Sequence, residues 1–361
     1  MEICAGAGGQ ALGLHNAGFE HRALIEIDPH AVQTLSHNAR GPGWERCEIL
    51  PWDLTSFDMD KLKEIVGDST LDLLAGGVPC PPFSLAGKQL GEADERDLFP
   101  VMLDMVEELQ PRAVMIENVR GLLEPEHKFQ DYRLRIRAHL ESLGYRILGW
   151  EVLEARDYGV PQLRPRAILV AMREPAASHF LRPQASKKIV TVAEALDETM
   201  RIRFGNSAKG RKHYEKWRRT AEEKGTVAPT LVGGSKKHGG ADLGPTRAKR
   251  AWAELGVDGH GVADPHGHTK NPERDLYGDR GPKLTVEQAA IIQGFPPDWE
   301  FQGRKTAAYR QVGNAFPPPV AQAVGESIIR ALKAAESGLQ PPEEPEGLFE
   351  PVAPRQLTLT G

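Results

Sequence analysis

The sequence predicts an α/β protein built on a doubly wound, mostly parallel sheet, with a second, smaller and loop-rich domain. Up to about residue 173, short apolar runs alternate with helical stretches, which is the pattern of parallel strands covered by helices. Several of these runs are almost entirely apolar, as strands buried on both faces must be. From about residue 173 to residue 281 the alternation stops, and Gly, Pro and basic residues dominate.

The elements of the first domain follow in chain order. Strands are expected at residues 2–4, 22–27, 71–75, 113–117, 147–152 and 166–171. Helices are expected between them at residues 10–17, 29–38, 98–109 and 133–143. Asp28 and Pro29 favour the start of the second helix, because Asp is a good N-cap and proline is tolerated in a first turn.

These elements divide the chain into four segments. Residues 1–180 form the α/β domain, residues 181–283 form the second domain, and residues 284–337 return to the first. This return includes an expected helix at residues 320–333, which places Val320, Val324, Ile328 and Leu332 on one face that can dock on a core. Residues 338–361 hold several prolines and few hydrophobic residues, so we expect a disordered tail.

Composition excludes several classes of protein. The 361 residues suffice for two to three domains, and 26% charged with 40% hydrophobic residues are typical of a globular protein. No apolar run approaches the roughly 18 residues of a membrane span, and no basic-then-apolar leader opens the chain. Cys4, Cys47 and Cys80 include no Cys-x-x-Cys pair, which excludes a disulfide framework or a zinc ribbon. We expect a cytoplasmic protein.

The charge is unevenly distributed along the chain. The net charge is -5, yet residues 201–250 hold 14 Lys and Arg against 4 Asp and Glu. The same segment contains His213, Tyr214 and Trp217, a mixture typical of surfaces that pair with phosphates and bases. A solvated, partly disordered insertion would explain the charge equally well.

A glycine-rich loop follows the first expected strand. Ala5-Gly6-Ala7-Gly8-Gly9 leads into a helix, and Glu26 lies at the end of the next strand. Glycine lets the backbone approach a ligand closely, and a carboxylate at this place can bind two ribose hydroxyls. The pattern indicates a nucleoside-containing cofactor, although it does not match Gly-x-Gly-x-x-Gly and a purely structural turn is the alternative.

Cys80 lies in a stiff, proline-rich segment, Gly76-Gly77-Val78-Pro79-Cys80-Pro81-Pro82-Phe83-Ser84, directly after the expected strand at 71–75. In an open α/β sheet, the segment just past the carboxyl end of a strand is where ligands bind. A thiolate is a strong nucleophile, and a nearby positive charge raises its population. We therefore interpret Cys80 as a nucleophile and the other two cysteines as inert, buried residues.

Two further strands carry ionisable side chains at one end. An apolar run from residue 113 ends at Glu117, and Gln162-Leu163-Arg164-Pro165-Arg166 enters the last expected strand. Taken singly, Glu117 as a helix cap or Arg164 in a surface ion pair would be the better interpretation. Together with a thiolate they make a pocket in which an electron-poor ring is attacked, hydrogen-bonded at a ring nitrogen and held at a carbonyl oxygen.

In this combination the sequence closely resembles the cytosine-5 DNA methyltransferases, over nearly the whole chain. The resemblance is carried by the glycine loop, by Pro79-Cys80, by Glu117-Asn118-Val119 and by Gln162-x-Arg164-x-Arg166, in the order and spacing of the family. Leu284-Thr285, Gln293-Gly294-Phe295-Pro296 and Gln311-Val312-Gly313-Asn314-Ala315-Phe316-Pro317 resemble its later motifs. The resemblance implies a Rossmann-like class I methyltransferase fold, S-adenosylmethionine as methyl donor, S-adenosylhomocysteine as product, and no metal.

The resemblance also implies roles for individual residues. Cys80 would add to C6 of a cytosine flipped out of double-stranded DNA, Glu117 would engage N3, and Arg164 or Arg166 would hold O2. The implied cofactor contacts are Ala5, Gly6, Gly8, Gly9, Glu26, Ile27, Asp53, Leu98 and Asn314. Residues 181–283 would be the target-recognition domain, and the implied DNA contacts are Ser84, Lys236, Lys237, Arg247, Lys249 and Arg250.

The family pattern implies a nucleoid-associated monomer that serves restriction-modification, with a cognate endonuclease that it need not contact. The sequence departs from the pattern in three places. Glu287 stands where an arginine is common, so the structural ion pair of the family is not expected there. Pro81-Pro82 stands where many members carry Gln after the cysteine, which bears on loop closure. The first strand begins at residue 2, where relatives usually have several residues before it, and this indicates a truncated or misassigned start.

Three other functions remain as alternatives. A tRNA-methylating relative would share the catalytic residues, a non-catalytic DNA-binding member would not need them, and a nicotinamide-dependent oxidoreductase would explain only the glycine loop and Glu26. His260, His266 and His268 with Asp264 suggest a metal site, but their glycine-rich setting favours a surface loop.

Overall fold

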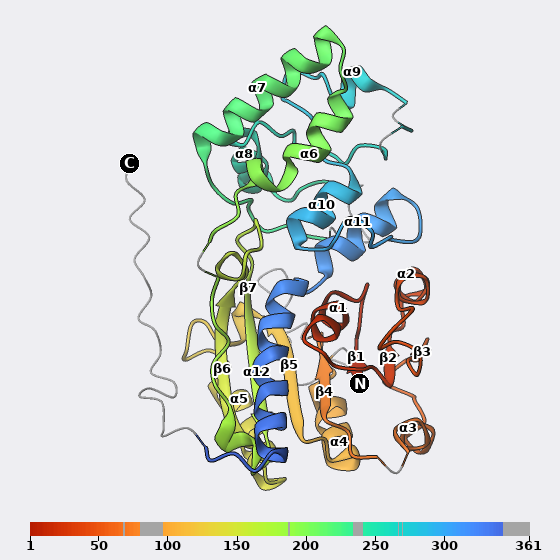
Figure 1. The fold of residues 1–361 in the computed structure, drawn as a ribbon, viewed down its shortest axis with the longest axis vertical. Helices are drawn as coiled ribbons and strands as arrows, with labels where there is room; N and C mark the ends of the chain where they lie inside the picture. The colour runs from red at the N-terminus through yellow and green to blue at the C-terminus, as the bar shows by residue number, and fades with distance from the viewer. Residues whose placement is uncertain are drawn as a thin grey trace.

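The computed structural model describes residues 1–67, 69–79, 97–186, 188–233, 241–265, 267–268 and 270–341 (Figure 1). In this part of the chain a sheet has the strand order β3-β2-β1-β4-β5-β7-β6. Its strands are β1 (Glu2–Ile3), β2 (Ala23–Ile25), β3 (Glu48–Leu50), β4 (Leu73–Gly76), β5 (Ala113–Val119), β6 (Arg146–Glu154) and β7 (Pro165–Met172). The predicted strands are present, whereas β3 was not predicted.

The sheet is doubly wound and mostly parallel, as predicted. The neighbouring strands from β3 to β5 pair in parallel, and only β7 runs antiparallel, to both β5 and β6. The chain winds outward from β1 through β2 to β3, and then returns to place β4 on the other side of β1. The strand order therefore reverses between β1 and β4, which is the place where open α/β sheets bind ligands.

Helices cover both faces of the sheet, because strand side chains point alternately to either face. Leu74 and Val114 pack with α3 (Met59–Val66), α4 (Phe99–Leu109) and α5 (Gln130–Ser142). Leu73 and Met115 face the other way, toward α1 (Gly9–Asn16) and α12 (Pro318–Glu336). Helix α2 (Pro29–Asn38) lies at the β2–β3 side and begins at Asp28, which caps it as expected. Short 3₁₀ helices are η3 (Arg120–Leu122), η4 (Ala155–Tyr158) and η5 (Ala176–His179).

The C-terminal helix α12 packs closely against α1. Val320, Val324, Ile328 and Leu332 of α12 are buried, as their spacing predicted. A Cβ atom at Gly13 of α1 would lie only 2.3 Å from the carbonyl oxygen of Pro318. Glycine at this position therefore allows α1 and α12 to pack backbone against backbone.

The second region lies beyond the carboxyl edge of the sheet and contains more helix than was predicted (Figure 1). Its helices are α6 (Val192–Phe204), α7 (Ala208–Lys224), α8 (Thr246–Glu254) and α9 (Pro272–Asp275), followed by α10 (Val286–Gln293) and α11 (Lys305–Asn314). Thr191 and Glu194 form a capping box that starts α6, and Ser207 caps α7. Between α7 and α10, the described residues are mostly loop.

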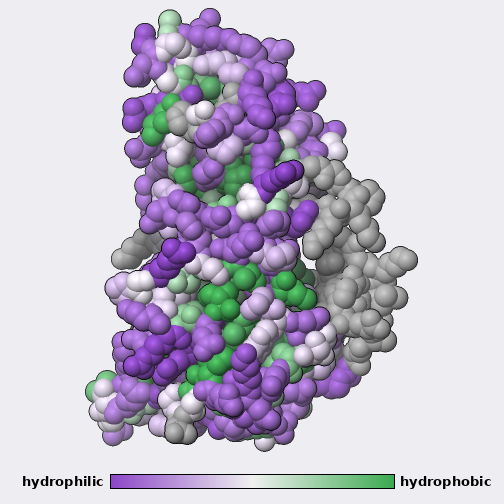
Figure 2. Space-filling view, turned by 90° about the vertical axis from the view of Figure 1, so that its right-hand side faces the viewer, coloured by the Kyte–Doolittle hydropathy of each residue, from purple (hydrophilic) through white to green (hydrophobic). Residues whose placement is uncertain are grey.

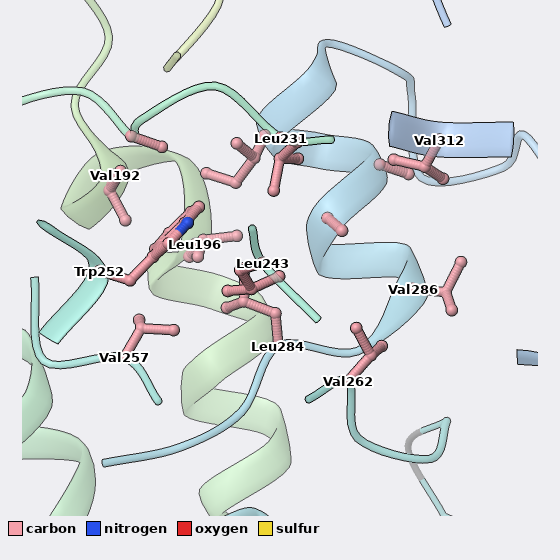
Figure 3. Close-up of a cluster of buried hydrophobic side chains, with 14 of the residues drawn as sticks. Val192, Leu196, Leu231, Leu243, Trp252, Val257, Val262, Leu284, Val286 and Val312 are labelled. Atoms are coloured by element: carbon pink, nitrogen blue, oxygen red, sulfur yellow. The ribbon is translucent and has the colours of Figure 1, made fainter. Parts of the chain in front are cut away.

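One hydrophobic cluster joins this region to the later helices (Figure 3). Trp252 of α8 is fully buried, and Figure 3 shows it beside Val192 and Leu196 of α6. Val286 of α10 and Val312 of α11 belong to the same cluster. Helices α10 and α11 therefore share a hydrophobic core with the second region. None of the helices in the described ranges combines the length and apolarity needed to span a bilayer.

Candidate active site

A cavity of about 490 Å³ opens at the switch point between β1 and β4. It is lined by the segments that follow β1, β2, β3 and β4, by Glu117 within β5 and by residues of α11. The face of the molecule drawn in Figure 2 carries hydrophobic surface in its lower half, and the region above is mostly hydrophilic. The cavity has the size of sites that hold a small organic ligand.

Glu26 organises the first side of the cavity. Its Oε2 accepts a hydrogen bond from the backbone N–H of Gly6 at 2.7 Å, and its Oε1 accepts one from that of Asp28 at 2.7 Å. The carboxylate thus ties the glycine loop to the end of β2. Ile27 follows it with 62% of its surface exposed and lines the cavity, so an apolar side chain is available to pack on a flat ligand.

All but two of the other predicted cofactor contacts line the cavity. Ala5, Gly6, Asp53, Leu98 and Asn314 line the cavity. The Oδ1 of Asp53 accepts hydrogen bonds from the backbone and hydroxyl of Thr55, which lower the pKa of Asp53.

The exceptions are Gly8 and Gly9, which are not among the lining residues. A Cβ atom at Gly9 would lie 2.1 Å from the carbonyl oxygen of Phe316, and one at Gly8 would lie 2.7 Å from the ring of Trp299. These two glycines therefore allow the loop to pack against the C-terminal segments, whereas Gly6 faces the cavity.

At the end of the cavity nearest β5, the lining residue Glu117 forms an ion pair with Arg166. Arg166 Nε lies 2.8 Å from Glu117 Oε1, and the two side chains are only 16% and 15% exposed. Antiparallel pairing explains the contact, because Glu117 lies opposite Ile168 and Arg166 is its diagonal neighbour on the same face. Burial raises the pKa of Glu117, against the opposing effects of Arg166 and Arg164.

The segment leading to Cys80 is held from β5. Asn118 is buried and donates a hydrogen bond to the carbonyl oxygen of Val78 at 3.0 Å, two residues before the cysteine. Gly77 and Pro79 line the cavity beside Glu117. Cys80 itself, and the predicted DNA contact Ser84, lie outside the described residues.

Comparison with known proteins is consistent with this geometry. The family model for C-5 cytosine-specific DNA methylases matches residues 1–330. The chain belongs to this family. It is a DNA cytosine-5-methyltransferase, hereafter the methylase.

Its relatives cover almost the whole chain. Type II methyltransferase M.NaeI of Lentzea aerocolonigenes is 49% identical over 339 residues, which are 94% of this chain and 76% of that protein. M.NgoMIV of Neisseria gonorrhoeae is 47% identical over 339 residues, 92% of this chain and 97% of that protein. Among solved structures, Dnmt2 of S. pombe has the same fold, with a TM-score of 0.57 and 17% sequence identity. The match covers 94% of this chain and 98% of that chain.

Arg166 pairs with the lining residue Glu117, although it does not itself line the cavity, whereas Arg164 of the methylase is engaged elsewhere. Arg164 is 1% exposed, and its terminal nitrogens donate to the carbonyl oxygens of Leu231, Gly313 and Ala315 at 2.7, 2.9 and 2.9 Å. These acceptors belong to the second region and to the end of α11. Arg164 therefore joins three distant segments and has no terminal nitrogen free for a substrate, which leaves Arg166 as the candidate for the substrate oxygen.

Replacing Arg164 by methionine should destabilise the methylase by about 3–5 kcal/mol, because three buried carbonyl groups lose their donor. Urea unfolding followed by circular dichroism measures the loss. Arg146→Met is a matched control, since this arginine is 43% exposed and 3.5 Å from Glu174, and surface pairs contribute about 0–1 kcal/mol. A similar, small loss for both variants would contradict the structural role.

The predicted DNA contacts divide into two groups. Lys236 and Lys237 lie outside the described residues. Arg247, Lys249 and Arg250 lie on α8, where Arg247 and Arg250 are exposed and Lys249 pairs with Asp242 at 2.8 Å. Two of these three cations are thus displayed to solvent.

The histidine cluster shows no metal site within the described part of the chain. Asp264 pairs with Lys305 at 2.8 Å, and His260 contacts Asp258 at 2.8 Å, so neither is directed at a shared ion. No group of three metal-ligating side chains occurs among the residues that the structure describes. His266 lies outside them.

Several lining residues were missed by the sequence analysis. Glu2 is 1% exposed, its Oε2 has no hydrogen-bond partner in the described structure, and burial raises its pKa well above the ordinary value. An acidic residue in an otherwise apolar strand was a signal in the sequence that could have identified Glu2 as a residue of the site. Arg310 of α11 also lines the cavity, and its spacing of four residues from Asn314 was a usable signal.

Proposed function

We propose that the methylase transfers a methyl group from S-adenosylmethionine to C5 of cytosine in one short double-stranded DNA sequence. The observation that carries this proposal is the Glu117–Arg166 pair, which borders the cavity beside the segment that leads to Cys80. An acid and a fixed guanidinium at this place match N3 and O2 of one cytosine ring. Extruding that base from the duplex costs a few kcal/mol.

The residues that line the cavity suit the proposed cofactor. Glu26 would bind the ribose hydroxyls, Ile27 would pack on the adenine, and Asp53 would face the adenine amino group. S-adenosylmethionine carries a sulfonium and an ammonium group, and the acidic side chains that line the cavity suit its positive charge. When bound, the cofactor supplies an activated methyl group, and S-adenosylhomocysteine remains after transfer.

The residues of the chain would then activate the base. The Cys80 thiolate forms a bond to C6 while Glu117 hydrogen-bonds or protonates N3 and Arg166 holds O2, which makes C5 nucleophilic. After C5 has gained the methyl group, N3 returns its proton, and loss of the C5 proton to solvent drives cleavage of the carbon–sulfur bond. The ring is restored and the Cys80 thiolate is released. Asn118 would support this chemistry by holding the Cys80 segment through Val78.

The basic second region would read the DNA. Residues 181–283 are proposed as the target-recognition domain, with phosphate contacts from Arg247 and Arg250 of α8 and from Lys236 and Lys237. The relatives named Type II methyltransferases support a role in restriction-modification, in which a separate endonuclease cuts the same sequence. A monomer contains every residue that this reaction requires.

Expression of the methylase in a host without cytosine methylation, followed by bisulfite sequencing, tests the function. We expect 5-methylcytosine at nearly every copy of one short sequence and at background level elsewhere. The same cells carrying the empty vector are the control. Genomic DNA without the modification, together with methylated cytosines in the cellular RNA, would reject DNA as the substrate.

A further inference from the structure

We propose that Arg310 is a cofactor-binding residue that holds the carboxylate of the methionine part of S-adenosylmethionine. This inference rests on the proposed function and identifies the group that recognises the one negative charge of the cofactor. It does not follow from the motifs in the sequence, because Arg310 precedes the stretch that carried the resemblance.

The charges around the cavity are strongly unequal. Five acidic side chains line it, namely Glu2, Glu26, Asp28, Asp53 and Glu117, and burial raises the pKa of Glu2 and Glu117 among them. Among the described lining residues, the basic side chains are His30 and Arg310, and Arg310 is the only guanidinium. The acidic side chains suit the sulfonium and the ammonium of the cofactor. Its carboxylate would be repelled by this surface unless a cation received it, and guanidinium groups bind carboxylates through paired hydrogen bonds.

Helix α11 presents Arg310 to the cavity in a fixed orientation. Ala307, Arg310 and Asn314 are spaced three and four residues apart, so they share the helix face that lines the cavity. Gln311 fixes the rotation of the helix, because its Oε1 accepts a hydrogen bond from Thr34 of α2 at 2.6 Å and its Nε2 donates to the carbonyl oxygen of Gln302 at 2.8 Å. Arg310 is thereby kept on the face of α11 that lines the cavity.

Arg310 has a donor that the described structure does not satisfy. Its Nε is buried and has no hydrogen-bond partner among the described residues. The Nε of Arg166, by contrast, pairs with Glu117. The Nε of Arg164 also has no partner among the described residues, but its terminal nitrogens have backbone acceptors. A buried donor without an acceptor is unfavourable, and a ligand that supplies one gains from it.

A DNA phosphate is the other anion that could reach this place. A Cβ atom at Gly233 would lie 2.8 Å from the carbonyl oxygen of Arg310 and 2.2 Å from the Oδ1 of Asn314, so the proposed recognition domain borders the site. Phosphate contacts are made by cations that protrude into solvent, as Arg247 and Arg250 do. The buried Nε at the cavity edge favours the cofactor.

Binding without DNA tests the proposal, because no turnover occurs. Isothermal titration calorimetry compares S-adenosylmethionine with decarboxylated S-adenosylmethionine, which lacks only the carboxylate. We expect the wild type to bind the complete cofactor roughly 10- to 100-fold more tightly than the decarboxylated one. Arg310→Met should weaken binding of S-adenosylmethionine by this factor and leave the decarboxylated compound within about threefold. Arg310→Lys should retain part of the preference.

Arg304→Met is the matched control, because it removes the same charge from the exposed N-cap of the same helix, away from the cavity. It should leave both affinities unchanged. If Arg310→Met weakened the binding of both compounds equally, this result would overturn the proposal and assign Arg310 a structural role. Unchanged cofactor binding with weaker duplex binding would also overturn it, in favour of a phosphate contact. A wild type that binds neither compound would instead reject the proposed cofactor itself.

Discussion

Replacing Cys80 by serine should reduce methyl transfer on the order of 10⁴-fold or more, with folding and cofactor binding retained. A hydroxyl is far less acidic than a thiol, whose pKa is about 8.5, so serine offers almost no anionic nucleophile near neutral pH. Incorporation of a radioactive methyl group into duplex DNA measures the rate. Methylation near the wild-type rate would exclude Cys80 as the nucleophile.

A chemical trap separates loss of the nucleophile from a general loss of activity. In DNA that contains 5-fluorocytosine at the target position, the C5 fluorine cannot leave as a proton does, so the covalent adduct persists. The wild type should form a complex that survives denaturing electrophoresis, and the Cys80→Ser variant should form none. Cys47→Ser is the matched control, because Cys47 packs against a core cluster away from the cavity and should leave trapping unchanged.

Glu117→Gln should slow methyl transfer by about 10²- to 10⁴-fold, the usual contribution of a positioned acid. Glutamine has nearly the same shape but cannot give a proton to N3, and it leaves Arg166 without its anionic partner at 2.8 Å. Single-turnover methylation measures the chemical step directly. Glu124→Gln is the control, because Glu124 is an exposed partner of Arg120 outside the cavity. A rate within a few fold of wild type would remove the proposed role of Glu117.

The pH dependence gives the same residue a second test. Burial raises the pKa of Glu117, so its acid form persists to higher pH than that of an exposed glutamate. If this acid form acts on N3, the single-turnover rate of the wild type should decrease as pH rises through the raised pKa. The rate of Glu117→Gln should not show this decrease. The folded state also favours the protonated form, so the stabilisation from protonating Glu117 is present at low pH and is lost as pH rises.

Much of the site could be predicted because its residues lie at the ends of strands. Glu26, Glu117 and the Cys80 segment each follow an apolar run, and parallel strands bring their carboxyl ends to one edge of the sheet. Gly6 and Glu26 were each predicted to contact the cofactor, and the backbone N–H of Gly6 donates a hydrogen bond of 2.7 Å to Glu26 Oε2. Local pattern and chain order were sufficient for these positions.

The sequence could not separate Arg164 from Arg166 or Gly6 from Gly9. These residues are close neighbours in the chain and share one motif each. Arg164 donates hydrogen bonds to Leu231 and Gly313, and Gly9 packs against the carbonyl oxygen of Phe316. All three partners are distant in sequence. Their roles follow from contacts across the fold, which periodicity along the chain does not record.

By itself, the sequence determined the doubly wound sheet, the family and the edge of the sheet that carries the site, because alternating apolar runs and short motifs are local properties. Tertiary structure alone decided the antiparallel direction of β7, which brings Arg166 to Glu117, and the position of α11, which brings Arg310 to the cavity. Both depend on pairing and packing between segments far apart in the chain, where burial of a shared surface selects one arrangement.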